Sequence, residues 1–169
     1  VYGLAKLMGG KKSFIDKLQM VFDEGLYDPA NEPDIAYPYL FSYFKGEEWR
    51  TQKETQRLLD KYFTTKPDGI PGNDDTGTMS SWAIFNMIGF YPDCPGLPEY
   101  TLTTPVFNKV TIRLDPKWYK EKELIIETNR TQPGTLYIDK VLLNGKKFNK
   151  YHITHDELVH GKYLKFDLK

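Results

Sequence analysis

The organisation of this 169-residue chain follows from one segment, Gly69-Ile-Pro-Gly-Asn-Asp-Asp-Thr-Gly-Thr-Met-Ser-Ser-Trp-Ala-Ile-Phe-Asn-Met-Ile-Gly89. Its first half is rich in glycine and proline, which predicts a loop. From Met79 the apolar residues recur at helical spacing, and the last glycine stands where helices commonly end. The segment therefore predicts a loop that places Asn73, Asp74 and Asp75 at the start of a buried helix.

Two interpretations of Asn73-Asp74-Asp75 are open at this point. Acidic side chains beside an apolar helix are costly unless a cation or a polar ligand binds them. A helix start favours negative charge by a few tenths to about 1 kcal/mol, which lowers this cost without removing it. The same residues beside glycine are also typical of an ordinary turn with a helix cap. An EF-hand calcium loop is excluded, because Gly77 falls one position early and Ile84 replaces the closing glutamate.

Composition excludes several classes of protein. Lys plus Arg and Asp plus Glu each number 23, so the net charge is zero and no nucleic-acid partner is predicted. No apolar run reaches the length of about 18 residues that a membrane span needs. Cys94 is the single cysteine, so an internal disulfide is excluded. The chain starts without an initiator methionine or a signal-peptide pattern, and we expect Val1 to lie inside a helix of a longer protein.

Hydrophobic periodicity predicts helices in the first half of the chain. The expected helices are Val1–Met8, a helix from an N-cap at Ser13 to Gly25, the buried aromatic segment Ile35–Phe44 with Pro38 in its first turn, Trp49–Phe63, and the helix from Met79. In the fourth of these, the spacing directs Trp49, Leu58, Leu59, Tyr62 and Phe63 inward and Lys53, Glu54, Arg57 and Lys61 into water.

The second half predicts strands. After the proline-rich connector Phe90–Glu99, alternation predicts strands at Tyr100–Thr104, Lys109–Leu114, Glu123–Thr128, Leu136–Leu143 and Tyr163–Leu168. Asn144-Gly145 predicts a hairpin turn, and Thr154-His155-Asp156-Glu157 predicts a short helical turn. We expect His152, His155 and His160 to be surface residues.

The predicted fold class is α+β: late helical hairpins of an (α/α)6 barrel followed by a small antiparallel β-region. A boundary near Pro98 divides the chain into residues 1–97, a partial barrel, and residues 98–169, the β-region. The connections between helices alternate in polarity, so acidic loops are expected along one end of the helical part.

A second acidic loop, Asn31-Glu32-Pro33-Asp34, precedes a buried helix as Asn73-Asp74-Asp75 does. Both loops could lie at the same end of a helical stack. Their amides and carboxylates form the oxygen-only donor set that Ca²⁺ prefers. No cluster of Cys and His residues points to zinc.

Three strings of this sequence resemble one family. They are Asn31-Glu-Pro-Asp followed by Pro38-Tyr-Leu-Phe-Ser-Tyr43, Gly69-Ile-Pro-Gly-Asn-Asp-Asp-Thr-Gly-Thr-Met-Ser-Ser-Trp82, and Gly89-Phe-Tyr-Pro92. They are similar, in register, to the calcium-dependent exo-acting α-mannosidases of glycoside hydrolase family 92. The resemblance implies a secreted or periplasmic enzyme with an N-terminal β-sandwich and an (α/α)6 barrel. It further implies hydrolysis of α-mannosidic bonds, most often α-1,2, in mannose-containing glycans.

The resemblance also implies the chemistry of the site. A carboxylic acid protonates the leaving oxygen, a carboxylate activates water, the anomeric carbon inverts, and Ca²⁺ holds and helps distort the sugar. Carried over residue by residue, Asp75 is the water-activating carboxylate beside the metal, and Asp74 orients or assists it. Asn31 and Glu32 face calcium and sugar, and Asn73 faces the sugar. The expected calcium ligands are thus Asn31, Glu32 and Asp75.

This sequence departs from the family pattern at Asp74, where glutamate is frequent, and at Ala30, where glycine is frequent. A larger departure is the general acid, which in the family lies upstream of the Asn-Glu-Pro loop. Residues 1–30 offer only Asp16, Asp23, Glu24 and Asp28, none in the acid's sequence context. The chain is therefore expected to be the C-terminal part of such an enzyme, inactive alone without the sandwich and much of the barrel.

Two rival hypotheses remain at the level of sequence. The chain could belong to a non-catalytic, calcium-dependent carbohydrate-binding module that grips sugar with the same loops. It could also be a structural module in which both acidic loops are turns.

Overall fold

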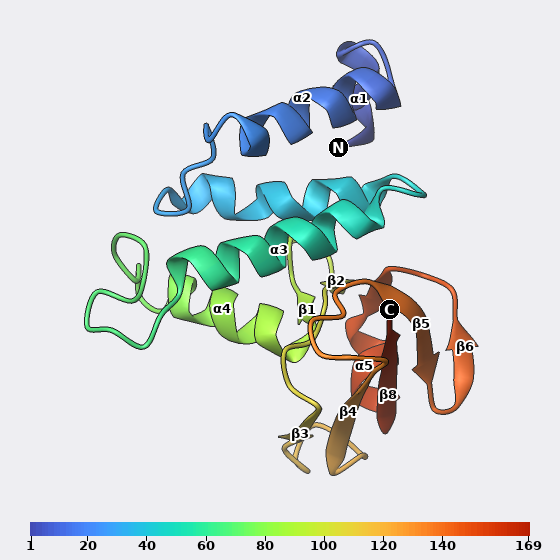
Figure 1. The fold of residues 1–169 in the computed structure, drawn as a ribbon. Helices are drawn as coiled ribbons and strands as arrows, with labels where there is room; N and C mark the ends of the chain where they lie inside the picture. Colours follow the sequence, from blue (N-terminus) through green and yellow to red (C-terminus); the bar gives the residue numbers. More distant parts are fainter. The chain divides into compact units, whose positions relative to one another are not determined.

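The computed structural model describes residues 1–169, with helices in the first part of the chain and strands mainly in the second (Figure 1). The predicted α+β class is confirmed. The chain separates into two compact units, Val1–Ala83 and Ile84–Lys169. This division falls inside a helix, α4 (Thr78–Ile88), which contributes residues to both units. The assignment of residues 1–97 and 98–169 to domains stays a prediction.

The first unit consists of helices in the predicted order. They are α1 (Tyr2–Leu7), α2 (Lys11–Asp23), the 3-10 helix η1 (Glu32–Tyr43), α3 (Glu48–Tyr62) and the first half of α4. The prediction of Ser13 as the N-cap of α2 is wrong, because the helix already begins after Gly10. This glycine has a φ of 109°, a conformation that residues with side chains rarely adopt.

The buried aromatic segment is a 3-10 helix that starts at Glu32, earlier than predicted. Pro33 occupies its first turn, whereas Pro38 lies inside it. Proline has no N–H group and its ring collides with the preceding turn of an α-helix, so two prolines disfavour regular α-helical bonding here. Tyr39 and Phe41 are fully buried, as the apolar pattern predicts.

Helix α3 follows the predicted pattern except at two residues. Leu58 and Leu59 are buried as expected, but Trp49 is 39% exposed and Glu54 is only 1% exposed. Glu54 can be buried because it accepts hydrogen bonds from Arg57 Nε at 2.6 Å and Gln19 Nε2 at 3.2 Å. A buried carboxylate is tolerated only when it is paired in this way.

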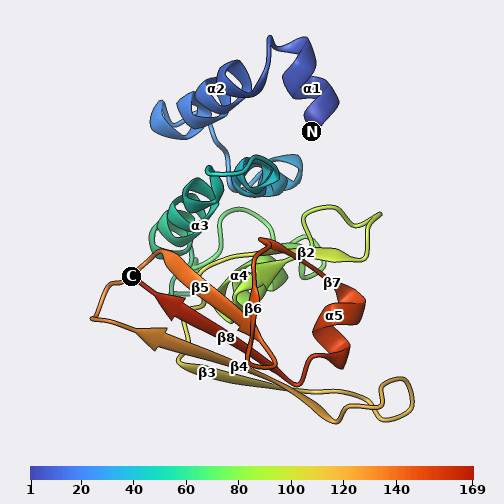
Figure 2. The same ribbon diagram turned by 90° about the vertical axis from the view of Figure 1, so that its right-hand side faces the viewer.

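The second unit contains two sheets and one short helix. Its elements are β1 (Phe90–Tyr91), β2 (Glu99–Leu102), β3 (Lys109–Arg113), β4 (Glu123–Arg130), β5 (Ile138–Leu143), β6 (Lys146–Phe148), β7 (His152–Thr154), α5 (His155–His160) and β8 (Tyr163–Leu168). One sheet has the order β1-β2-β7. The other has the order β3-β4-β8-β5-β6, whose strands are labelled in Figure 2. All strand pairs are antiparallel except β4 and β8, which run parallel.

Two local signals of the second unit are confirmed. Asn144 and Gly145 have φ values of 51° and 78°, as a two-residue hairpin turn between β5 and β6 requires. Thr154 and Glu157 form a reciprocal capping box at the start of α5.

The expectation that His155 is a surface residue is wrong. It is half-buried, and its two ring nitrogens lie 2.9 Å from Tyr100 Oη and 3.2 Å from Tyr119 Oη.

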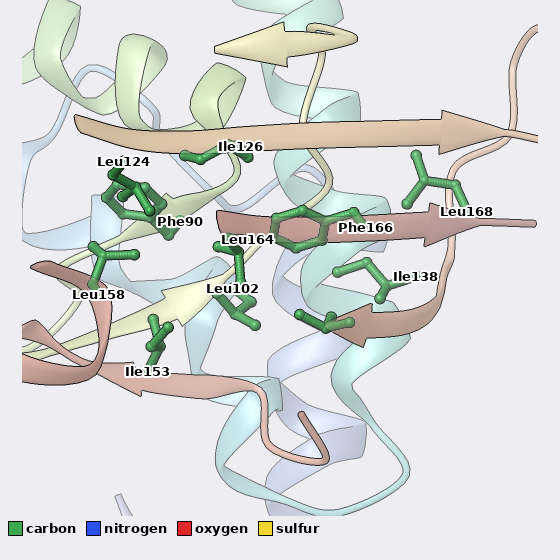
Figure 3. Close-up of a cluster of buried hydrophobic side chains, with 11 residues drawn as sticks. Phe90, Leu102, Leu124, Ile126, Ile138, Ile153, Leu158, Leu164, Phe166 and Leu168 are labelled. Atoms are coloured by element: carbon green, nitrogen blue, oxygen red, sulfur yellow. The ribbon is translucent and has the colours of Figure 1, made fainter. Parts of the chain in front are cut away.

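The core of the second unit lies on the inner faces of its sheets. Figure 3 shows side chains from β1, β2, β4, β5, β7, β8 and α5 converging on one cluster. Its labelled members are Phe90, Leu102, Leu124, Ile126, Ile138, Ile153, Leu158, Leu164, Phe166 and Leu168. None of the helices combines the length and apolar character that a membrane span requires.

Candidate functional site

The first acidic loop is attached to the start of α4 through Asp74. Its Oδ1 accepts a hydrogen bond from the Ser80 main-chain N–H at 2.8 Å, and its Oδ2 accepts one from Ser80 Oγ at 3.1 Å. The Asp74 carbonyl also accepts a hydrogen bond from the Met79 N–H at 3.2 Å. The first N–H groups of a helix have no partner inside the helix, so the Asp74 carboxylate supplies one from outside.

Asp75 is held differently. Its main chain has a φ of 49° and that of Thr76 a φ of 60°, so two consecutive non-glycine residues adopt the left-handed conformation. Such residues cost on the order of 1 kcal/mol or more each and persist only where their surroundings hold them. The Asp75 carbonyl accepts a hydrogen bond from Thr78 Oγ1 at 2.8 Å. Its carboxylate is exposed and makes no hydrogen bond or ion pair within the chain, so it is available to a ligand.

The second acidic loop is organised by Asp28 and Asp34. Asp28 Oδ1 accepts a hydrogen bond from the Ala30 N–H at 2.9 Å, and Asp34 Oδ2 accepts one from the Asp28 N–H at 3.4 Å. The charge of Asp34, together with burial and a hydrogen bond between the side chains, raises the pKa of Tyr37. Asn31 precedes η1 without capping it through its side chain.

The side chains of Asn31 and Glu32 are exposed in this loop, and neither makes a hydrogen bond or ion pair with the chain. Asn73, in the first loop, is exposed in the same way. The polar side-chain atoms of the predicted substrate-facing residues are thus exposed to solvent and form no hydrogen bond within the chain.

The two loops are neighbours, an arrangement that the sequence left open as a possibility. A Cβ atom added to Gly72 would lie 2.8 Å from Ala30 Cβ and 3.4 Å from Ala30 Cα, so the loops touch one residue before Asn73 and Asn31. The helices behind them are joined as well. Trp82 Nε1 of α4 donates a hydrogen bond to the Ile35 carbonyl of η1 at 3.3 Å, and the Trp82 ring stacks on Phe63 at 5.2 Å between centroids.

The donors of the two loops fit calcium by chemical type. Amide and carboxylate oxygens from Asn31, Glu32, Asn73 and Asp75 are the ligands that this hard cation takes. No three His, Cys, Asp or Glu side chains come close enough together to hold a metal ion on their own. A calcium ion at this place would therefore need amide, main-chain or water oxygens besides the carboxylates, and the predicted ligand set stays a prediction.

Sequence comparison establishes the family. The profile of the Glycosyl hydrolase family 92 catalytic domain matches residues 1–169. This chain belongs to glycoside hydrolase family 92. The family 92 chain is 29% identical over 165 residues to a protein of Arthroderma benhamiae described as an uncharacterized secreted glycosidase, a match that covers 98% of this chain and 21% of the relative.

Solved structures of the same family share its fold. A family GH92 alpha-mannosidase from Bacteroides thetaiotaomicron superimposes with a TM-score of 0.86 at 33% identity. The match covers 95% of this chain and 22% of the mannosidase chain. A family GH92 inverting mannosidase from the same organism gives a TM-score of 0.84 at 31% identity. This match covers 99% of this chain and 25% of the mannosidase chain. The family 92 chain therefore spans about a fifth to a quarter of the length of these proteins.

The four acidic residues that precede the second loop differ in their surroundings. Asp16 pairs with Lys12, Asp23 accepts a hydrogen bond from Gln19 at 2.9 Å, and Asp28 is engaged with Ala30 in the loop itself. Glu24 caps the C-terminal end of α2 with its main chain. None of these contacts gives the family 92 chain a second carboxyl group beside Asp75.

The roles of two residues, and one contact between the loops, were missed in the sequence. Ser80 and Trp82 belong to the string that carries the family resemblance, but only the fold shows that one binds Asp74 and the other Ile35. A serine in the first helical turn, six residues after an aspartate, is a signal that could have indicated the cap. No local pattern indicates the contact between Gly72 and Ala30, because 42 residues separate them in the numbering of the chain.

Proposed function

We propose that the complete protein is a calcium-dependent exo-acting α-mannosidase that hydrolyses mannose from glycans with inversion, acting on α-1,2 linkages. Membership of family 92 supports a glycoside hydrolase role, and the two structures described above are titled alpha-mannosidase and inverting mannosidase. A further structure of the first of these enzymes holds mannoimidazole. The observation that carries the proposal in this chain is the exposed Asp75 carboxylate, in a loop that touches the Asn31-Glu32 loop at Gly72 and Ala30.

Asp75 is proposed to accept the proton of the attacking water. An inverting glycosidase needs one carboxylate for this step and one carboxylic acid to protonate the leaving oxygen, with about 6.5–9.5 Å between them. The rigid turn that holds the Asp75 main chain would keep its carboxylate in one place during proton transfer. Bound calcium would supply positive charge and oxygen coordination to the sugar at the same loops.

The general acid is proposed to lie in the part of the complete protein that precedes this chain. The chain spans about a fifth to a quarter of the length of its relatives, which supports a protein with further domains. The same reasoning predicts that the 169-residue chain is inactive alone. The name of the Arthroderma benhamiae relative supports a secreted protein, and a periplasmic location is the alternative.

The test uses the complete protein with α-1,2-mannobiose as substrate. Proton NMR recorded in the first minutes should show β-mannose as the first product, because inversion of an α-linkage yields the β-anomer. A chelator should abolish the release of mannose and added Ca²⁺ should restore it. An α-anomer as first product would contradict inversion, and full activity in the chelator would contradict calcium dependence.

A non-catalytic carbohydrate-binding protein is the second candidate. The chain itself favours it in one respect, because exposed amides and carboxylates are present while none of Asp16, Asp23, Glu24 and Asp28 lies in the sequence context of the family's general acid. Under this hypothesis the complete protein would bind mannobiose in the presence of Ca²⁺ without cleaving it. Asp75→Asn would then leave sugar affinity nearly unchanged, and no variant would alter a rate.

A further inference from the structure

We propose that the contact between Gly72 and Ala30 sets the spacing of the two acidic loops, so that these two residues are positioning residues of the site. The geometry of the contact is independent of the proposed function, and only its consequence for catalysis rests on that function. Neither residue has a polar side chain, and neither would touch a substrate through one.

The space between the two residues admits no additional atom. A Cβ atom on Gly72 would lie 2.8 Å from Ala30 Cβ, which is shorter than real Cβ contacts, and 3.5 Å from the Ala30 carbonyl oxygen. Gly72 also has a φ of 67°, which residues with side chains adopt at a cost. Position 72 is therefore restricted to glycine for two separate reasons, one local and one set by the opposite loop.

Ala30 cannot easily move away from such a contact. Its N–H donates a hydrogen bond to Asp28 Oδ1 at 2.9 Å, and the next N–H, that of Asn31, donates one to the Asp28 carbonyl at 3.2 Å. On the other side, Asp74 ties the first loop to Ser80 of α4. A side chain at position 72 would therefore strain one of these anchored turns or push the loops apart.

The consequence for the site follows from chain geometry. Consecutive Cα atoms are about 3.8 Å apart, so the contact keeps the Cα atoms of Asn31 and Asn73 no more than about 12.5 Å apart. At that separation two short side chains pointing inward can approach one ion or one sugar. A displacement of about 1 Å at a reacting centre can lower a rate by on the order of 100-fold.

The experiment is a double-mutant cycle in the complete protein with Gly72→Ala, Ala30→Gly and both together. The unfavourable φ is present in Gly72→Ala and in the double variant, whereas the clash with a methyl group is present only in the former. Gly46→Ala is the matched control, because Gly46 has a φ of 90° in the same unit and open space around its Cβ position.

The first readout is hydrogen exchange of the hydrogen-bonded main-chain N–H groups between residues 28 and 34, which are those of Asp28, Ala30, Asn31 and Asp34. Gly72→Ala should accelerate exchange there at least fivefold although the substitution lies in the other loop, and adding Ala30→Gly should restore it. Gly46→Ala should leave these groups unchanged. Equal exchange of residues 28–34 in Gly72→Ala and in the wild type would overturn the inference.

The second readout is kcat/KM for mannobiose. We expect a loss on the order of 10- to 100-fold in Gly72→Ala and recovery to within about threefold of Ala30→Gly in the double variant. If Gly72→Ala does not fold, folding of the double variant supports the contact, and failure of both overturns it. A wild-type protein that releases no mannose would refute the proposed function, while the exchange measurement would still decide this inference.

Discussion

Asp74 and Asp75 are adjacent in the chain, and we expect their substitution to affect different properties of the complete protein. Both carboxylate oxygens of Asp74 accept hydrogen bonds from Ser80, whereas the Asp75 carboxylate has no partner. Asp74→Ala should therefore lower local stability, and Asp75→Asn should lower the rate of hydrolysis.

The magnitudes follow from these contacts. Loss of a helix cap typically costs about 0.5–2 kcal/mol, so about 1 kcal/mol is expected for Asp74→Ala. Asp74→Asn keeps one acceptor for the Ser80 N–H, but it loses the acceptor of the Ser80 Oγ bond and the charge near the helix start, the latter worth about 0.3–1 kcal/mol. Asp75→Asn removes no internal contact and asparagine tolerates the left-handed conformation well, so its stability change should stay within about 0.5 kcal/mol.

The expected catalytic effect has the opposite order. A general base contributes about 10²–10⁴-fold, so Asp75→Asn should lower kcat by that factor with saturating Ca²⁺ present. Substrate affinity should fall much less, because the amide oxygen can still face metal or sugar. Asp74→Asn should retain most of kcat, because the amide keeps the loop attached to α4.

Two assays separate the effects. Steady-state kinetics on mannobiose measures kcat, and hydrogen exchange of the Ser80 N–H measures the cap. A loss of about 1 kcal/mol corresponds to about fivefold faster exchange in Asp74→Ala. An inactive Asp74→Asn together with an Asp75→Asn within about threefold of wild type would refute the assignment and exchange the two roles. Normal turnover in both variants would place the base outside this loop.

Three further outcomes are expected. Glu32→Ala and Asp75→Ala should each weaken calcium binding by the complete protein in titration calorimetry, and unchanged affinity in both would place the ion elsewhere. The isolated 169-residue chain should release no mannose, because inversion needs two carboxyl groups; release above that of a denatured sample would contradict this expectation. The hydrogen bond from the Thr154 N–H, together with Lys150 nearby, lowers the pKa of Glu157 in the folded protein. The stability that Glu157 adds is therefore complete above its unfolded pKa near 4.5, and it is lost as the pH falls through the lower pKa of the folded protein. Acid unfolding should accordingly be steeper in the wild type than in Glu157→Gln, and equal slopes would show that the capping box of α5 does not contribute.

Most elements of the fold could be predicted because their signals are local. The apolar spacing from Met79 and the glycine at position 89 marked α4, and Asn144-Gly145 marked the β5–β6 turn. These residues limit the conformation of their own neighbours, and hydrophobic periodicity reports which face of an element is buried. The candidate site residues Asn31 and Asp75 were likewise proposed from short motifs, and their roles stay predictions.

Other features depended on residues far away in the chain. Glu54 looks like a solvent-facing residue of an amphipathic helix, but Gln19 of α2 and Arg57 allow it to be buried. His155 lies between two tyrosines that come from different elements. The prediction that Pro38 lies in the first turn of its helix assumed a helix that starts at Ile35. Because η1 starts at Glu32, Pro38 lies inside it.

The sequence by itself determined the helices and the longer strands, the β5–β6 turn, and which oxygen-bearing side chains could form a site, but not the short strands β1, β6 and β7. Only the tertiary structure decided the parallel pairing of β4 with β8, the use of Asp74 as a cap, and the contact of Gly72 with Ala30. The physical reason is that conformational preference acts between neighbours in the chain. The choice of partners is made by packing among segments that the chain brings together only after it folds.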